Sequence, residues 1–158
     1  GILISKFDYK KQDDAKRIDF GKKNTMKFWE ISSGSSEDLS YMKNGSLELI
    51  LKPQSSSDKK IELVIQCSKD VNQINISGTK ECYKAFDLSN LLIDEPIGVW
   101  KKITMPFSCL NNDNFEISSI TSRAKLATSG DWVVDIHSIK YLNNMEMKTC
   151  KLLSEDYE

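Results

Sequence analysis

Residues 44–67, NGSLELILKPQSSSDKKIELVIQC, contain the clearest structural pattern of the chain. Leucine stands at every second position of residues 46–52, the spacing that places one face of a β-strand in a core. The serine-rich residues 55–58 form a predicted turn. After the turn, residues 60–67 place isoleucine and leucine on one face and Val64 on the other, which indicates a central strand.

Similar short apolar runs occur further along the chain, bounded by clusters of Ser, Asn, Gly and Asp. Residues 99–107 and 132–142 are the clearest of them, and such regularly spaced short strands are typical of an antiparallel β-sandwich or barrel. Only residues 11–17 and 88–93 have compositions suited to a short helix. The sequence therefore predicts an all-β fold in which no helix organises the structure.

The chain of 158 residues has the length of one domain with one hydrophobic core. We expect residues 1–142 to form the sandwich. Residues 143–158 are polar with scattered Met and Leu, so we expect them to be a polar tail or linker.

The 22 basic residues nearly balance the 23 acidic residues. A chain without a net field of either sign has no general attraction for nucleic acid or for an anionic membrane surface. No apolar run approaches the roughly 20 residues that span a bilayer. We therefore expect neither nucleic acid nor a membrane among the partners.

The four cysteines are Cys67, Cys82, Cys109 and Cys150. They lack the close C-x-x-C spacing of a zinc site, and a single histidine cannot complete one. Free thiols in a reducing compartment and disulfides in an oxidising one both fit, and four cysteines allow three full pairings. Spacing alone does not choose between these states.

The only histidine, His137, stands inside an apolar strand. Acid–base catalysis needs at least two titratable groups that converge in a pocket, and no such pattern is present. We therefore expect no catalytic residue, and an independent enzyme is the least favoured hypothesis.

Aromatic side chains are the more informative candidates, because sugar rings offer apolar faces that stack on flat aromatic rings. We take Trp29, Tyr41 and Trp132 as candidate carbohydrate-binding residues. Trp29 is the best of them because it borders the Ser- and Gly-rich residues 31–36. The competing interpretation for each Trp is an ordinary place in the core.

Three collinear stretches of sequence support a more specific interpretation. They are DYKKQDDAKR at 8–17, CYKAFDL at 82–88 and WKKITMPFSCL at 100–110. Together, over residues 3–142, the chain resembles the C-terminal galactose-binding-like domain, a jelly-roll β-sandwich, of family 3 glycoside hydrolases of the exo-β-glucosidase and glucan glucohydrolase type. The resemblance assigns a structural role to the motif residues Gln12, Asp14, Arg17 and Trp100.

The resemblance implies a non-catalytic accessory domain that packs on the catalytic domains of a periplasmic or extracellular β-glucosidase-like enzyme, with β-glucan as a further expected ligand. A structural or protein-interaction galactose-binding-like domain without a sugar ligand is the alternative. Jelly-roll accessory domains also hold structural calcium through oxygen ligands, for which Asp8 and Asp135 are the candidates. No other cofactor is expected.

The implied exported location favours a disulfide among Cys67, Cys82 and Cys109. A bridge from Cys67 to Cys82 would close a loop of about 15 residues and would stabilise the fold by about 3 kcal/mol. Cys150 would then be the spare cysteine.

Overall fold

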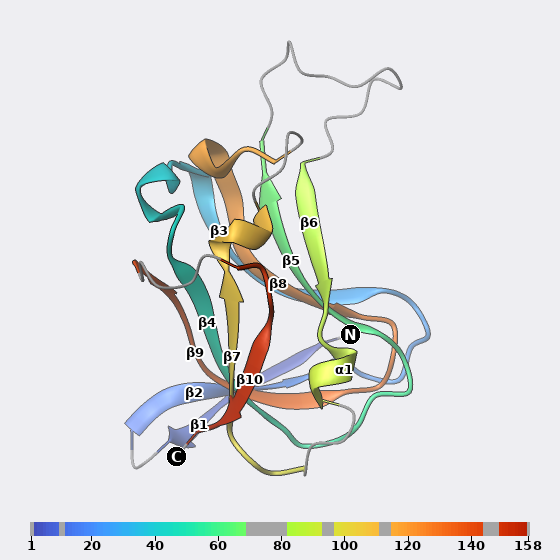
Figure 1. The fold of residues 1–158 in the computed structure, drawn as a ribbon. Helices are drawn as coiled ribbons and strands as arrows, with labels where there is room; N and C mark the ends of the chain where they lie inside the picture. Colours follow the sequence, from blue (N-terminus) through green and yellow to red (C-terminus); the bar gives the residue numbers. More distant parts are fainter. Residues whose placement is uncertain are drawn as a thin grey trace.

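Two antiparallel β-sheets pack face to face to form a sandwich (Figure 1). The computed structural model describes residues 2–9, 12–68, 82–92, 97–110, 115–143 and 149–157. Within these residues, one sheet has six strands in the order β1-β2-β9-β4-β7-β10, and the other has four in the order β3-β8-β5-β6. The predicted all-β sandwich is confirmed.

The six-stranded sheet contains β1 (Leu3–Tyr9), β2 (Gln12–Asp19), β9 (Val133–Leu142), β4 (Ser46–Pro53), β7 (Lys101–Pro106) and β10 (Leu153–Asp156). The four-stranded sheet contains β3 (Lys27–Glu37), β8 (Ile120–Thr128), β5 (Ile61–Cys67) and β6 (Tyr83–Asp87). The connections include the short helix α1 (Ser89–Leu92) and the 3-10 turns η1 (Ser40–Met42), η3 (Phe107–Leu110) and η4 (Ile117–Ser119). No helix in these segments is both long and apolar enough to cross a membrane.

The alternating leucines of β4 explain its central place in the larger sheet. Leu47, Leu49 and Leu51 are fully buried between the two sheets, while β9 and β7 pair with β4 on either side. The strand begins after Gly45, where a Cβ would collide with the backbone oxygen of Leu142, so only glycine permits this close approach of the two chains.

The core lies between the two sheets and takes one face from each central strand. Its members from β5 and β8 are Ile61, Leu63, Ile65, Cys67, Ile120, Ala124 and Leu126. Side chains on alternate positions of the same strands point away from the core, so each sheet also presents an outer face to solvent.

The segment 11–17, expected as a short helix, lies instead largely in strand β2. That prediction is wrong because it rested on local composition, whereas β2 is held by pairing with β1 and β9 and by the burial of Ile18. The other predicted helix, residues 88–93, contains α1.

The segment 143–158, expected as a polar tail or linker, contributes strand β10 to the larger sheet. β10 pairs antiparallel with β7, and Glu155 and Asp156 form ion pairs with Lys102 and Lys101. A local scan of polarity could not reveal a strand whose partner lies about 50 residues earlier.

All four cysteines are in disulfides. Cys67, at the end of β5, is joined to Cys82, and Cys109 is joined to Cys150. The expectation that Cys150 is a spare thiol is therefore wrong. The segment before β10 lies beside η3, and the Cα atoms of Cys109 and Cys150 are 4.7 Å apart.

Candidate functional site

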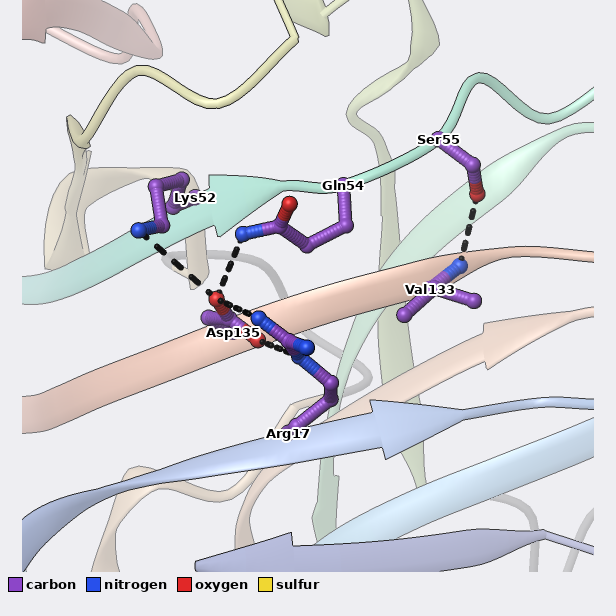
Figure 2. A network of polar contacts seen from close by, with 6 residues as sticks. All are labelled: Arg17, Lys52, Gln54, Ser55, Val133 and Asp135. Atoms are coloured by element: carbon purple, nitrogen blue, oxygen red, sulfur yellow. Dashed lines mark hydrogen bonds and ion pairs between the residues drawn. The ribbon is translucent and has the colours of Figure 1, made fainter. Parts of the chain in front are cut away.

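A network of polar contacts surrounds Asp135 on the outer face of the larger sheet (Figure 2). The guanidinium of Arg17 donates to both carboxylate oxygens, with Nε 2.7 Å from Oδ1 and Nη2 3.1 Å from Oδ2. Gln54 Nε2 donates to Oδ2 at 2.6 Å, and the Lys52 ammonium lies 3.8 Å from the same oxygen. The hydrogen bond to Asp135 raises the pKa of Arg17 above its ordinary value.

This network has a structural role. The carboxylate of Asp135 on β9 is fully buried. Arg17 reaches it from the neighbouring strand β2, and Lys52 and Gln54 reach it from β4 and from the residue directly after β4. A buried carboxylate is tolerated only when paired and hydrogen-bonded, so these contacts fix three neighbouring strands together. The structural role of Arg17 stays a prediction, which the Arg17→Met variant tests.

The surroundings of Asp135 do not fit a calcium site. A guanidinium, an ammonium and an amide N–H face the carboxylate, whereas calcium needs six to eight oxygen ligands. Strand β2 separates β1, which contains Asp8, from β9. The side chains of Asp8, Gln12 and Asp14 lie outside the described part of the structure. Among the side chains that are described, no group of three His, Cys, Asp or Glu residues could hold a metal.

Trp132 belongs to the core and is not an exposed platform. Its side chain is 1% exposed, and its ring stacks on Phe20 with the centroids 5.7 Å apart. The prediction that the Trp132 ring is a carbohydrate-binding platform is therefore wrong. Trp132 precedes β9, and the backbone N–H of Phe20 donates to its carbonyl, which ties the end of β2 to the start of β9.

Trp29 is half-buried at the open edge of the sandwich. It packs against the core and lines a shallow hollow of about 140 Å³ together with Ile31, Ile136 and His137. Only part of its ring therefore faces outward.

Trp100, the motif residue, lies half-buried on the outer face of the larger sheet. The Lys52 ammonium lies 4.9 Å from its ring centroid, and His137 meets it edge-on at 6.3 Å. Both neighbours contact the indole, and the structural role of Trp100 stays a prediction.

The three aromatic candidates do not converge. Tyr41 is 71% exposed in η1, the teal turn at one end of the sandwich in Figure 1. Trp132 lies near α1 at the other end, and Trp29 lies on the edge strand β3. No single ligand of a few sugar units could contact all three.

The outer face of the four-stranded sheet carries two exposed rings that are not among the residues predicted from the sequence. Phe28 on β3 is 50% exposed and Tyr83 on β6 is 54% exposed. A low apolar floor is left by Val64 on β5, the largely buried Ala127 on β8 and Ala85 on the edge strand β6.

Charged side chains lie around this floor, and contacts among them hold them in place. The Lys125 ammonium lies 4.4 Å from the ring centroid of Phe28 and 3.8 Å from the carboxylate of Glu30. Ser122 Oγ donates to the same carboxylate at 3.1 Å. Two exposed rings, a shallow floor and fixed polar groups are the components of a surface that could hold an extended polar ligand.

Residues 1–141 match the family model Exop_C, described as galactose-binding domain-like. The chain belongs to this family. The predicted galactose-binding-like fold is confirmed, and strand β10 lies beyond the residues matched to Exop_C. No curated protein sequence matches the chain.

Three solved structures show the same fold as this Exop_C domain. The exo-1,3/1,4-β-glucanase ExoP of a Pseudoalteromonas species is 16% identical with a TM-score of 0.62, and the match covers 94% of this chain and 16% of the glucanase. The extra C-terminal domain of ExoP, solved alone, is 17% identical with a TM-score of 0.61 over 89% of this chain and 69% of that domain. A family 30 carbohydrate-binding module is 17% identical with a TM-score of 0.71, over 95% of this chain and 77% of the module. The chain thus spans a small part of the whole glucanase and most of each separate domain.

Proposed function

We propose that this Exop_C domain is a non-catalytic accessory module of a glycoside hydrolase and that it binds β-glucan. The main support is the Exop_C match over residues 1–141, together with the shared fold of the extra C-terminal domain of a β-glucanase and of a carbohydrate-binding module. The parent enzyme supplies the catalysis, and the accessory domain packs on its catalytic domains and holds the substrate nearby.

The outer face of the four-stranded sheet is the proposed binding surface. Its two exposed rings can stack on the apolar faces of sugar rings, while Glu30 and Lys125 offer hydrogen-bonding partners to sugar hydroxyls. Trp29, Trp132 and Trp100 are less suited because other side chains cover much of each ring.

The separation of the rings favours a chain of several sugar units over a single unit. The strand register places Phe28 opposite Ala127, Ala127 opposite Glu62 and Glu62 opposite Asp87. Tyr83 stands four residues from Asp87 on β6. Three strand spacings of about 4.8 Å and four residues of about 3.3 Å each place the two rings roughly 20 Å apart. Affinity should therefore rise with the length of the oligosaccharide.

The two disulfides support an exported location for the domain. Disulfides persist in the periplasm and outside the cell, whereas cytosolic thiols are kept reduced. A periplasmic or extracellular domain would meet a polymeric glucan, which is consistent with the proposed ligand.

Calorimetric titration with β-1,3- and β-1,4-linked gluco-oligosaccharides of increasing length tests this function. We expect saturable binding that tightens with length. Phe28→Ala and Tyr83→Ala should each weaken it at least fivefold, about 1 kcal/mol. Tyr41→Ala is the matched control, since it removes a more exposed ring from another surface. If no oligosaccharide binds, the protein-interaction alternative replaces this proposal.

A further inference from the structure

A pocket of about 280 Å³ lies at the end of the sandwich near α1. Its walls come from the end of β4 and the loop after it, the first residue of β5, helix α1, Ile97 ahead of β7 and the chain just before β9. The lining residues are Pro53, Ser55, Ser56, Ser57, Lys59, Ile61, Ser89, Leu92, Ile97 and Trp132. None of them belongs to the proposed glucan-binding face.

Three of the four serine hydroxyls in the wall are held by the backbone. Ser55 Oγ accepts the N–H of Val133 at 2.9 Å (Figure 2), and Ser89 Oγ accepts the N–H of Ile61 at 3.0 Å. Ser57 Oγ accepts the backbone N–H two residues further on at 3.2 Å. A hydroxyl that already accepts a hydrogen bond still has its own hydrogen to donate. Ser89 also makes a side-chain hydrogen bond with the Asp87 carboxylate, so the hydroxyls of Ser55 and Ser57 are the serine donors that the pocket offers.

Other side chains of the lining are apolar. Pro53, Leu92 and Ile97 contribute aliphatic surface, and the buried indole of Trp132 also lines the pocket. The Lys59 ammonium also lines the pocket, and it can donate hydrogen bonds but cannot accept them. The pocket thus combines apolar side chains with a set of hydrogen-bond donors.

We propose that this pocket is a second carbohydrate site, which binds one terminal pyranose unit of a glycan. A pyranose ring has apolar C–H faces for the apolar side chains and several hydroxyl oxygens that accept from the serines. The volume lies just below the roughly 300–1,000 Å³ of common small-molecule sites, which suits one sugar unit and excludes a chain passing through. The choice of a sugar rests on the proposed function, whereas the location rests on the pocket alone.

The three tryptophans provide a direct test in the intact domain. Methyl β-glucoside, methyl β-galactoside, methyl β-mannoside and glucuronate are each titrated while the assigned indole N–H signals are followed by NMR. We expect a saturable shift of the Trp132 signal with at least one sugar, and no shift for Trp29 or Trp100. Ser57→Ala should weaken this binding about fivefold or more, because it removes one fixed donor.

A matched control separates this pocket from the glucan-binding face. Phe28→Ala should leave the Trp132 response to the methyl glycoside unchanged while it weakens binding of long oligosaccharides. If Trp132 stays silent with all four probes while oligosaccharides bind, the pocket inference is overturned and the proposed function stands. A Trp132 response that Ser57→Ala leaves unaltered also overturns the pocket inference.

Discussion

Removal of the Cys109–Cys150 disulfide tests whether the end of the chain is part of the domain. The bridge joins η3 to the segment before β10 and spans 41 residues of sequence. For a closed loop of that length, the entropy lost by the unfolded chain corresponds to about 4 kcal/mol at 25 °C. The double variant Cys109→Ser, Cys150→Ser should lose stability of this order.

Little else in β10 can offset this loss. The strand has four residues, and its pair of Glu155 with Lys102 is exposed, whereas the Lys101 side chain that pairs with Asp156 is buried. Exposed pairs contribute about 0–1 kcal/mol each, because water and salt screen them. For a domain of this size, about 4 kcal/mol lowers the melting temperature by roughly 8–16 °C.

Urea and thermal denaturation under oxidising conditions measure this effect. The matched control is Cys67→Ser, Cys82→Ser, which opens a loop of 15 residues and should cost about 3 kcal/mol. The two loops share no residue, so the losses should add in the quadruple variant. If the Cys109 and Cys150 variant unfolds at the same urea concentration as the wild type, this reasoning is refuted.

Three further predictions concern the core and the outer faces. Arg17→Met should destabilise the domain by about 2 kcal/mol in urea, less than the full cost of a broken buried pair, because Arg17 is 48% exposed and Lys52 remains near Asp135. Trp132→Ala should cost about 3–5 kcal/mol in the same assay, and a loss below 1 kcal/mol would show that Trp132 is not a core residue. Burial raises the pKa of Tyr141 above its ordinary value, so the fold favours the neutral phenol. Its contribution to stability is complete below the ordinary tyrosine pKa of about 10 and is lost as the pH rises further. Ultraviolet titration should therefore show that Tyr141 ionises only as the domain unfolds, and ionisation of Tyr141 at its ordinary pKa in the folded domain would contradict this.

The central strands could be predicted from sequence because their burial pattern is local. Alternate leucines predicted β4, and residues 99–107 and 132–142 contain β7 and β9. In each case, one face of the strand packs in the core and the other faces away. Because successive side chains of a strand point to opposite faces, the buried face is visible in the sequence as apolar residues at every second position.

Strands β2 and β10 could not be predicted in this way. Their sequences are rich in charged residues, and each is stabilised by a partner far away in the chain. Arg17 forms its ion pair with Asp135, 118 residues later, and Cys150 forms its disulfide with Cys109. Local composition contains no information about such pairings.

The candidate surface was missed because residue type was given more weight than strand parity. Trp29 shares its parity with Ile31, and both lie on the inner side of β3, while Phe28 shares its parity with the charged Glu30. A strand that alternates in this way places the tryptophan inside and the phenylalanine outside. The sequence already contained this signal, whereas the position of Tyr83 required the pairing of β6 with β5.

The central claim is that this Exop_C domain binds β-glucan on the outer face of its four-stranded sheet. The most direct measurement is an NMR titration of the isotopically labelled wild-type domain with a β-gluco-hexasaccharide, with every backbone amide followed. The account predicts saturable shifts concentrated on β3, β8, β5 and β6 and centred on Phe28 and Tyr83. Saturable shifts confined to the larger sheet, or no saturable shift at all, would contradict it.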